Sequence, residues 1–212
     1  MNNTESKNFL QNNLVAVFTE FPVKSPAKRG LTFADMCGCP ELTQSKRIQL
    51  GYRLENALNR AINDHPETVS LKGRGTSLWM QLVTNKMSTR GTGKGKKDMD
   101  CCFTLINKDG YVYYFEIKTN LNLDTEKSKA TIEKVKKITT CLEESESYPR
   151  GVFSSHLSPF WDNTDVVISS TMKHADIMFF GQFCELMGWT ITRADWIDML
   201  QDVGKKFLGK KL

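Results

Sequence analysis

Residues 101–119 read CCFTLINKDGYVYYFEIKT, and this stretch predicts a β-hairpin. Strand-forming residues fill 101–106, and aromatic and β-branched residues are frequent in 111–119. Between them, Asn107-Lys-Asp-Gly110 contains an Asp-Gly pair, a strong signal for a tight turn. We therefore expect two antiparallel strands here, with the remaining elements packed around them.

Helical periodicity flanks the hairpin on both sides. Ser45 can cap a helix that extends to about Asp64, with one stripe formed by Ile48, Tyr52, Glu55, Leu58 and Ile62. Asp124 or Thr125 can cap a second helix that extends to about Glu144, with Ile132, Val135, Ile138, Thr139 and Leu142 on one face. Glu55 is the only carboxylate in its stripe, and a buried charge is costly unless it is paired or used.

The remaining elements are short. Residues 69–83 alternate loosely and could form a strand, and residues 165–170 predict a short buried strand. Residues 148–164 are expected to be a loop. Helices are expected at residues 175–187 and 193–207, the second capped by Thr192. The order predicts an α/β (α+β) fold around a small sheet.

The composition fits a globular domain. Hydrophobic residues make up 40% and charged residues 25% of the 212 residues. We expect a single domain, with an irregular N-terminal segment at 1–44, a core at 45–170 and C-terminal helices at 171–212. The apolar runs, such as 14–18 and 177–180, are too short for a membrane span, and residues 1–7 lack an apolar signal core. The expected location is the cytoplasm.

Metal sites built on cysteine and histidine are not expected. The six cysteines and three histidines show no spacing that suits zinc. The histidines also have no serine, aspartate or cysteine partner at a motif-like spacing, so the sequence gives no support for nucleophilic catalysis. Reduced cysteines acting as small hydrophobic residues are the expected state.

Positive charge is concentrated between Glu67 and Asp98. This stretch contains no acidic residue, and its basic residues are Lys72, Arg74, Lys86, Arg90, Lys94, Lys96 and Lys97. Its five glycines, at 73, 75, 91, 93 and 95, allow a backbone to approach a ligand closely. Clustered basic residues beside glycine suit contacts with a phosphate backbone, although a solvated surface loop would have the same composition.

A candidate catalytic group lies on the predicted hairpin. Residues two apart on a strand share a face, so Glu116 and Lys118 point the same way. The hairpin brings Asp98 and Asp100 back toward them. Two converging carboxylates favour Mg²⁺, and an adjacent lysine suits metal-assisted hydrolysis of a phosphodiester. A surface ion pair and ordinary turn chemistry are the alternative interpretation.

The residues Asp100 … Glu116-Ile-Lys118 resemble the PD-(D/E)xK nuclease superfamily, with Met99 where proline often stands. The segment from Glu116 to Lys127 is similar to that of some type II restriction endonucleases. The resemblance covers about Ser45 to Ile138. It implies a restriction-endonuclease-like core, a small mixed sheet with helices on both faces. It also implies Mg²⁺-dependent cleavage of double-stranded DNA that leaves 5′-phosphates, by a homodimer at a palindromic site.

The resemblance also assigns roles. Asp100 and Glu116 would bind the metal, with the backbone carbonyl of Ile117 as a further ligand. Lys118 would position or deprotonate the attacking water. Glu55 would contact the metal through water, or would be a buried glutamate paired with a neighbour. Asp98 competes with Asp100 for the motif position, because the spacing in this superfamily varies.

DNA contacts are expected from the basic stretch. Lys94, Lys96 and Lys97 are candidates for phosphate contacts. Candidates for base contacts are Arg74, Gln81, Asn85 and Arg90, with the loop at 148–163 as a second choice. Two other functions stay open: a repair or recombination nuclease of the same superfamily, and a DNA-binding protein without catalysis. A restriction enzyme would have a DNA methyltransferase as its genetic partner, because the host genome needs protection.

Overall fold

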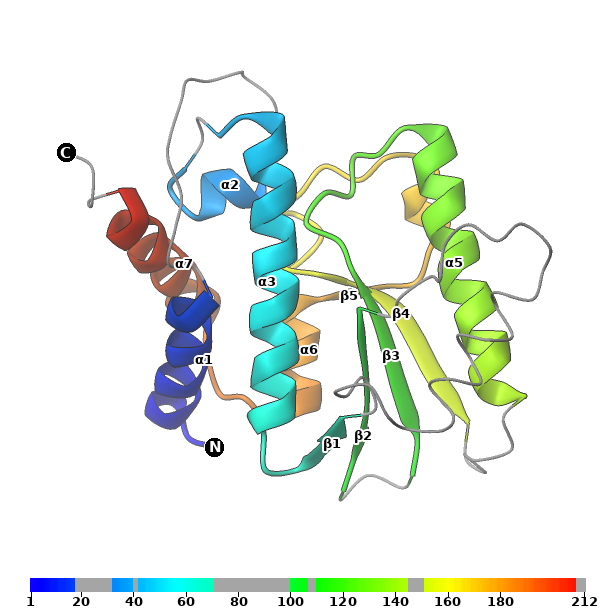
Figure 1. The fold of residues 1–212 in the computed structure, drawn as a ribbon, viewed down its shortest axis with the longest axis horizontal. Helices are drawn as coiled ribbons and strands as arrows, with labels where there is room; N and C mark the ends of the chain where they lie inside the picture. The colour runs from blue at the N-terminus through cyan, green and yellow to red at the C-terminus, as the bar shows by residue number, and fades with distance from the viewer. Residues whose placement is uncertain (18–31, 40–41, 71–99, 107–109, 145–150, 209–212) are drawn as a thin grey trace.

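The protein is built around one mixed five-stranded sheet with strand order β1-β2-β3-β4-β5 (Figure 1). The computed structural model describes residues 1–17, 32–39, 42–70, 100–106, 110–144 and 151–208. The strands are β1 (Thr68–Ser70), β2 (Cys101–Leu105), β3 (Val112–Ile117), β4 (Val152–Ser158) and β5 (Ile177–Phe179). Strands β1, β2 and β3 form an antiparallel meander, whereas β4 and β5 continue the sheet parallel to β3. The α/β class is therefore confirmed.

The predicted hairpin is confirmed as the centre of the sheet. Cys101 pairs with Phe115, and Cys102 pairs with Tyr114, in antiparallel register. Gly110 has φ +72°, the left-handed conformation that a glycine adopts without strain. Nearly every residue of both strands is buried, because helices cover both faces of the sheet.

Helices cover the sheet on both faces (Figure 1). Helix α5 (Thr125–Glu143) packs on one face, where Val135, Ile138 and Leu142 meet Cys102 and Tyr114. The other face carries α3 (Gln44–Asp64) and α6 (Phe180–Met187), which share one core with β2 and β3. The chain also forms two short helical elements, α2 (Phe33–Met36) and the 3₁₀ turn η1 (Met172–His174).

Helices α1 (Asn3–Val17) and α7 (Arg193–Leu208) lie outside α3 and pack on each other. Lys7 and Asp195 join the two helices with an ion pair of 2.9 Å between Nζ and Oδ1. The expectation of an irregular segment over residues 1–44 is wrong for α1. That helix is rich in asparagine and polar residues, and its helical state depends on buried contacts of Leu10 and Leu14.

Three expectations about the C-terminal half need correction. Strand β4 lies inside the expected loop 148–164, and residues 165–170 form no strand. The helix expected over 175–187 begins only at Phe180, because residues 177–179 pair with β4. The sequence of β4 contains three serines and a histidine, so it lacks the β-branched pattern of an isolated strand. Its pairing with β3 and β5 overrides that weak propensity.

The predicted stripe of the helix at 45–64 is also partly wrong. Ile48 and Tyr52 are 55% and 63% exposed. The buried face consists of Leu50, Leu54, Ala57, Leu58, Ala61 and Ile62. Thr43, rather than Ser45, caps the helix by accepting a hydrogen bond from the backbone of Lys46. The caps Asp124 and Thr192 are confirmed. Within the described segments, every helix is too short or too polar to cross a bilayer.

Candidate functional site

Asp100 and Glu116 meet at one end of the hairpin, on the face that α5 covers. Glu116 lies two residues after Tyr114 on β3, and Asp100 lies directly before β2. Extending the β2–β3 register by one position places these two residues opposite each other. The side chains share a face with Cys102 and Tyr114, which pack under α5. Asp100 is 9% exposed and Glu116 is 3% exposed. This end of the sheet lies between α3 and α5 (Figure 1).

Lys118, which directly follows β3, lies beside both carboxylates, as its position two residues after Glu116 predicts. Its Nζ is 2.7 Å from Glu116 Oε1 and 3.9 Å from Asp100 Oδ2. The backbone N–H of Lys118 donates to the carbonyl of Leu157, which anchors the end of β3 to β4. The lysine side chain keeps 24% of its surface exposed. The ammonium group is therefore next to the two acids and still reaches solvent.

A second lysine, which the sequence did not single out, completes the cluster. Lys134 reaches over from α5, with Nζ 2.5 Å from Glu116 Oε2 and 3.5 Å from Asp100 Oδ1. The hydroxyl of Tyr114 donates to the same Oε2 at 3.2 Å. Lys134 precedes Ile138 by four residues, so it flanks the apolar face of α5, and this position was the available signal.

The surroundings shift the pKa values of the two carboxylates in opposite directions. Burial, and then the charge of Glu116, raise the pKa of Asp100 to about 6 from a usual value of 3.8. Burial also acts to raise the pKa of Glu116, but Lys118 and Lys134 outweigh it and lower that pKa. Two acids this close cannot both ionise easily, so Asp100, whose contacts with the two lysines are longer than those of Glu116, keeps its proton to a higher pH.

The backbone and helix α3 add to the site. The N–H of Ile117 donates to Asp100 Oδ2 at 3.0 Å, which fixes that carboxylate. The expected role of the Ile117 carbonyl as a metal ligand stays a prediction. Glu55 comes close enough for its charge to raise the pKa of Asp100 further, after burial and Glu116. The two roles expected of Glu55, a metal contact through water or a buried pair with a neighbour, stay predictions.

The other expected site residues lie outside the described part of the chain. These are Asp98 and the seven DNA-binding candidates Arg74, Gln81, Asn85, Arg90, Lys94, Lys96 and Lys97. The structure places Asp100 next to Glu116, which supports Asp100 as the motif acid, whereas Asp98 is not among the described residues.

The donor set fits a hard divalent cation. Asp100 and Glu116 present carboxylate oxygens, the ligands that Mg²⁺ prefers. Among the described residues, no three or more Asp, Glu, His or Cys side chains are grouped to hold a metal. A bound Mg²⁺ would thus take its other ligands from backbone oxygen, water or substrate, which is its usual behaviour.

His156 is a further neighbour that the sequence analysis missed, because it lies in the expected loop. It pairs with Glu116 in the β3–β4 register, so both side chains lie on one face. The ring is buried, and among the described residues its Nε2 has no hydrogen-bond partner. Burial lowers the pKa of His156, which keeps the ring neutral at pH 7. It adds a wall to the site without adding charge.

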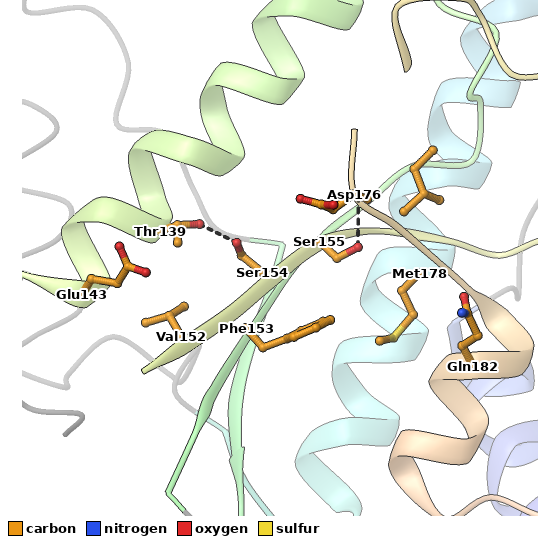
Figure 2. Close-up of a pocket in the computed structure, with 10 residues that line it drawn as sticks. Thr139, Glu143, Val152, Phe153, Ser154, Ser155, Asp176, Met178 and Gln182 are labelled. Carbon is orange, nitrogen blue, oxygen red and sulfur yellow. Dashed lines mark hydrogen bonds between the residues drawn. The ribbon is translucent and has the colours of Figure 1, made fainter. Parts of the chain in front are cut away.

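A separate pocket of about 560 Å³ lies beside β4 and β5 (Figure 2). Its described lining residues include the acidic side chains Glu143 and Asp176 and no basic one. In Figure 2 the hydroxyl of Thr139 points to Ser154, and these oxygens are 2.7 Å apart. The two carboxylates and two lysines of the candidate site are not part of this lining. An acidic pocket repels phosphate, so it is a poor place for DNA.

Comparison with known proteins adds nothing to this picture. No family model, no curated protein and no solved structure matches the chain.

Because the pKa of Asp100 is raised and that of Glu116 is lowered, neutralising each acid should change stability in opposite directions. At pH 8, Asp100→Asn should raise the free energy of unfolding by about 1–3 kcal/mol, because the folded protein no longer ionises a carboxyl whose pKa is raised to about 6. Glu116→Gln should lower it, because the ionised form of Glu116 is the favoured one. Urea unfolding of both variants in EDTA measures the two changes.

The pH dependence has a definite sign. The folded protein holds the Asp100 proton more tightly than the unfolded chain, so stability falls as pH rises from about 4 to about 6. The advantage of Asp100→Asn should therefore disappear near pH 4. A loss of stability in Asp100→Asn at pH 8 would show that the two lysines hold this carboxylate in its charged form.

Proposed function

We propose that this protein is a Mg²⁺-dependent type II restriction endonuclease. It would cleave double-stranded DNA at a short palindromic site and leave 5′-phosphates. The observation that carries the proposal is the grouping of Asp100, Glu116 and Lys118 on one face of the hairpin, with Lys118 Nζ 2.7 Å from Glu116 Oε1. The mixed sheet with helices on both faces supports it.

Each residue has a role in this mechanism. Asp100 and Glu116 would hold Mg²⁺, which would act as a Lewis acid toward the phosphate and make a water molecule more acidic. The N–H of Ile117 and the hydroxyl of Tyr114 hold the two carboxylates in their orientation. Lys118 orients or deprotonates the water that attacks the phosphate in line, and its charge offsets the negative charge that develops there. The 3′-oxygen leaves.

The proposal also includes the DNA contacts. The acid-free stretch between Glu67 and Asp98 carries seven basic residues, directly before Asp100 in the chain. Such a stretch would bring positive charge to the phosphate backbone. A homodimer would present two such sites to the two strands of a palindrome.

Digestion of a plasmid of known sequence is the direct test. With Mg²⁺, we expect discrete bands whose ends map to one short sequence and carry 5′-phosphates. With EDTA, we expect no cleavage. Intact duplex together with cutting of mismatched or branched DNA would favour the repair nuclease instead. Binding without cleavage of either substrate would indicate a non-catalytic DNA-binding protein.

A further inference from the structure

The two carboxylates already hold two cations of the protein's own. Lys118 contacts Glu116 Oε1 and Asp100 Oδ2, while Lys134 contacts the other oxygen of each acid, Glu116 Oε2 and Asp100 Oδ1. Two negative charges thus face two positive charges in a largely buried cluster. A divalent cation that joined this cluster unchanged would leave an excess of positive charge at short range, which low dielectric makes costly.

Lys134 is the better placed of the two lysines to be exchanged. Its Nζ bridges the acids at 2.5 and 3.5 Å, a shorter pair of distances than the 2.7 and 3.9 Å of Lys118. The two carboxylates would keep their orientation after the ammonium group withdraws, because the Ile117 N–H still donates to Asp100 and the Tyr114 hydroxyl still donates to Glu116. A lysine stem is long and has many rotamers, so the group can swing away.

We propose that Lys134 is a tethered cation that occupies the place between Asp100 and Glu116 in the metal-free protein and withdraws when a divalent cation binds. This inference rests on the proposed metal site, and it goes beyond it by assigning a competitor. The lysine prevents repulsion between the two buried acids until metal arrives. It also weakens metal binding, because its contacts must be broken first.

Metal affinity of variants tests the exchange. In isothermal titration with Mg²⁺ and no DNA, Lys134→Gln should bind roughly tenfold more tightly than the wild type or better, because a competing charge is gone. Lys137→Gln is the matched control, since Lys137 is exposed on the same helix and pairs with Glu133. It should bind as the wild type does. Equal or weaker binding by Lys134→Gln would overturn the exchange.

A second measurement uses the wild-type protein and does not depend on the folding of a variant. Competitive acetylation, read by mass spectrometry, should modify Lys134 severalfold faster when Mg²⁺ is present, because withdrawal exposes the amine. Lys137 should react at the same rate in both conditions. An unchanged rate for Lys134 under saturating Mg²⁺ would overturn the proposal.

The outcomes separate this inference from the proposed function. If Mg²⁺ binds, Glu116→Gln removes the binding, and Lys134 neither competes nor becomes reactive, then only the tethered-cation proposal fails. If Mg²⁺ binds and exchanges with Lys134 but no DNA is cut, the proposed nuclease fails and the exchange stands. If no Mg²⁺ binding depends on Glu116, both fail.

Discussion

Lys118→Ala should lower the rate of DNA cleavage by about a thousandfold while DNA binding persists. The reason is that Lys118 Nζ lies beside both carboxylates and is the amine assigned to the attacking water. The variant should fold, because Lys134 and the Tyr114 hydroxyl still contact Glu116. Single-turnover cleavage in Mg²⁺ measures the rate, and gel-shift titration in EDTA measures binding.

The loss of a positive charge in Lys118→Ala needs a control, because removing any lysine weakens binding to DNA slightly. Lys137→Ala removes the same charge from an exposed position on α5 and should cleave at the wild-type rate. A Lys118→Ala protein that cleaves as fast as the wild type would rule out the proposed site and leave its chemistry to another part of the chain.

Gly204→Ala should lower the free energy of unfolding by about 2 kcal/mol. A Cβ at residue 204 in α7 would overlap the carbonyl oxygen of Cys37 and lie 2.9 Å from its carbonyl carbon. Overpacking costs about 1–3 kcal/mol, and backbone atoms cannot rotate away, so we expect the upper end of that range. The better helix propensity of alanine returns about 1 kcal/mol. Urea unfolding in EDTA measures the difference.

Gly51→Ala is the matched control for this substitution. Gly51 also lies within a helix, α3, but its added Cβ would meet the side-chain hydroxyl of Thr119 at 3.1 Å. That hydroxyl can move away by changing rotamer. The better helix propensity of alanine should offset the cost of this rotamer change, so stability should stay nearly unchanged. Equal losses in both variants would mean that close packing of α7 on Cys37 is not the cause.

The hairpin and its acids could be predicted from local sequence, because strand alternation fixes which residues share a face. Glu116 lies on β3 and Lys118 directly follows that strand, and their side chains do meet. The helix stripe was predicted less well: Ile48 and Tyr52 fit the period but are exposed. A period shows that a helix has an apolar side, whereas the packing partner selects which of two overlapping stripes is buried.

Sequence by itself determined the mixed α/β class, the turn at Gly110, the cap at Asp124 and the shared face of Glu116 and Lys118. These features depend on neighbours within a few residues, where geometry is set by the chain's own period. Only the tertiary structure decided that β4 is a strand, that Lys134 reaches Glu116, and that Gly204 touches Cys37. Such contacts join distant segments, and how elements pack on one another, not local propensity, sets which side chains come within reach.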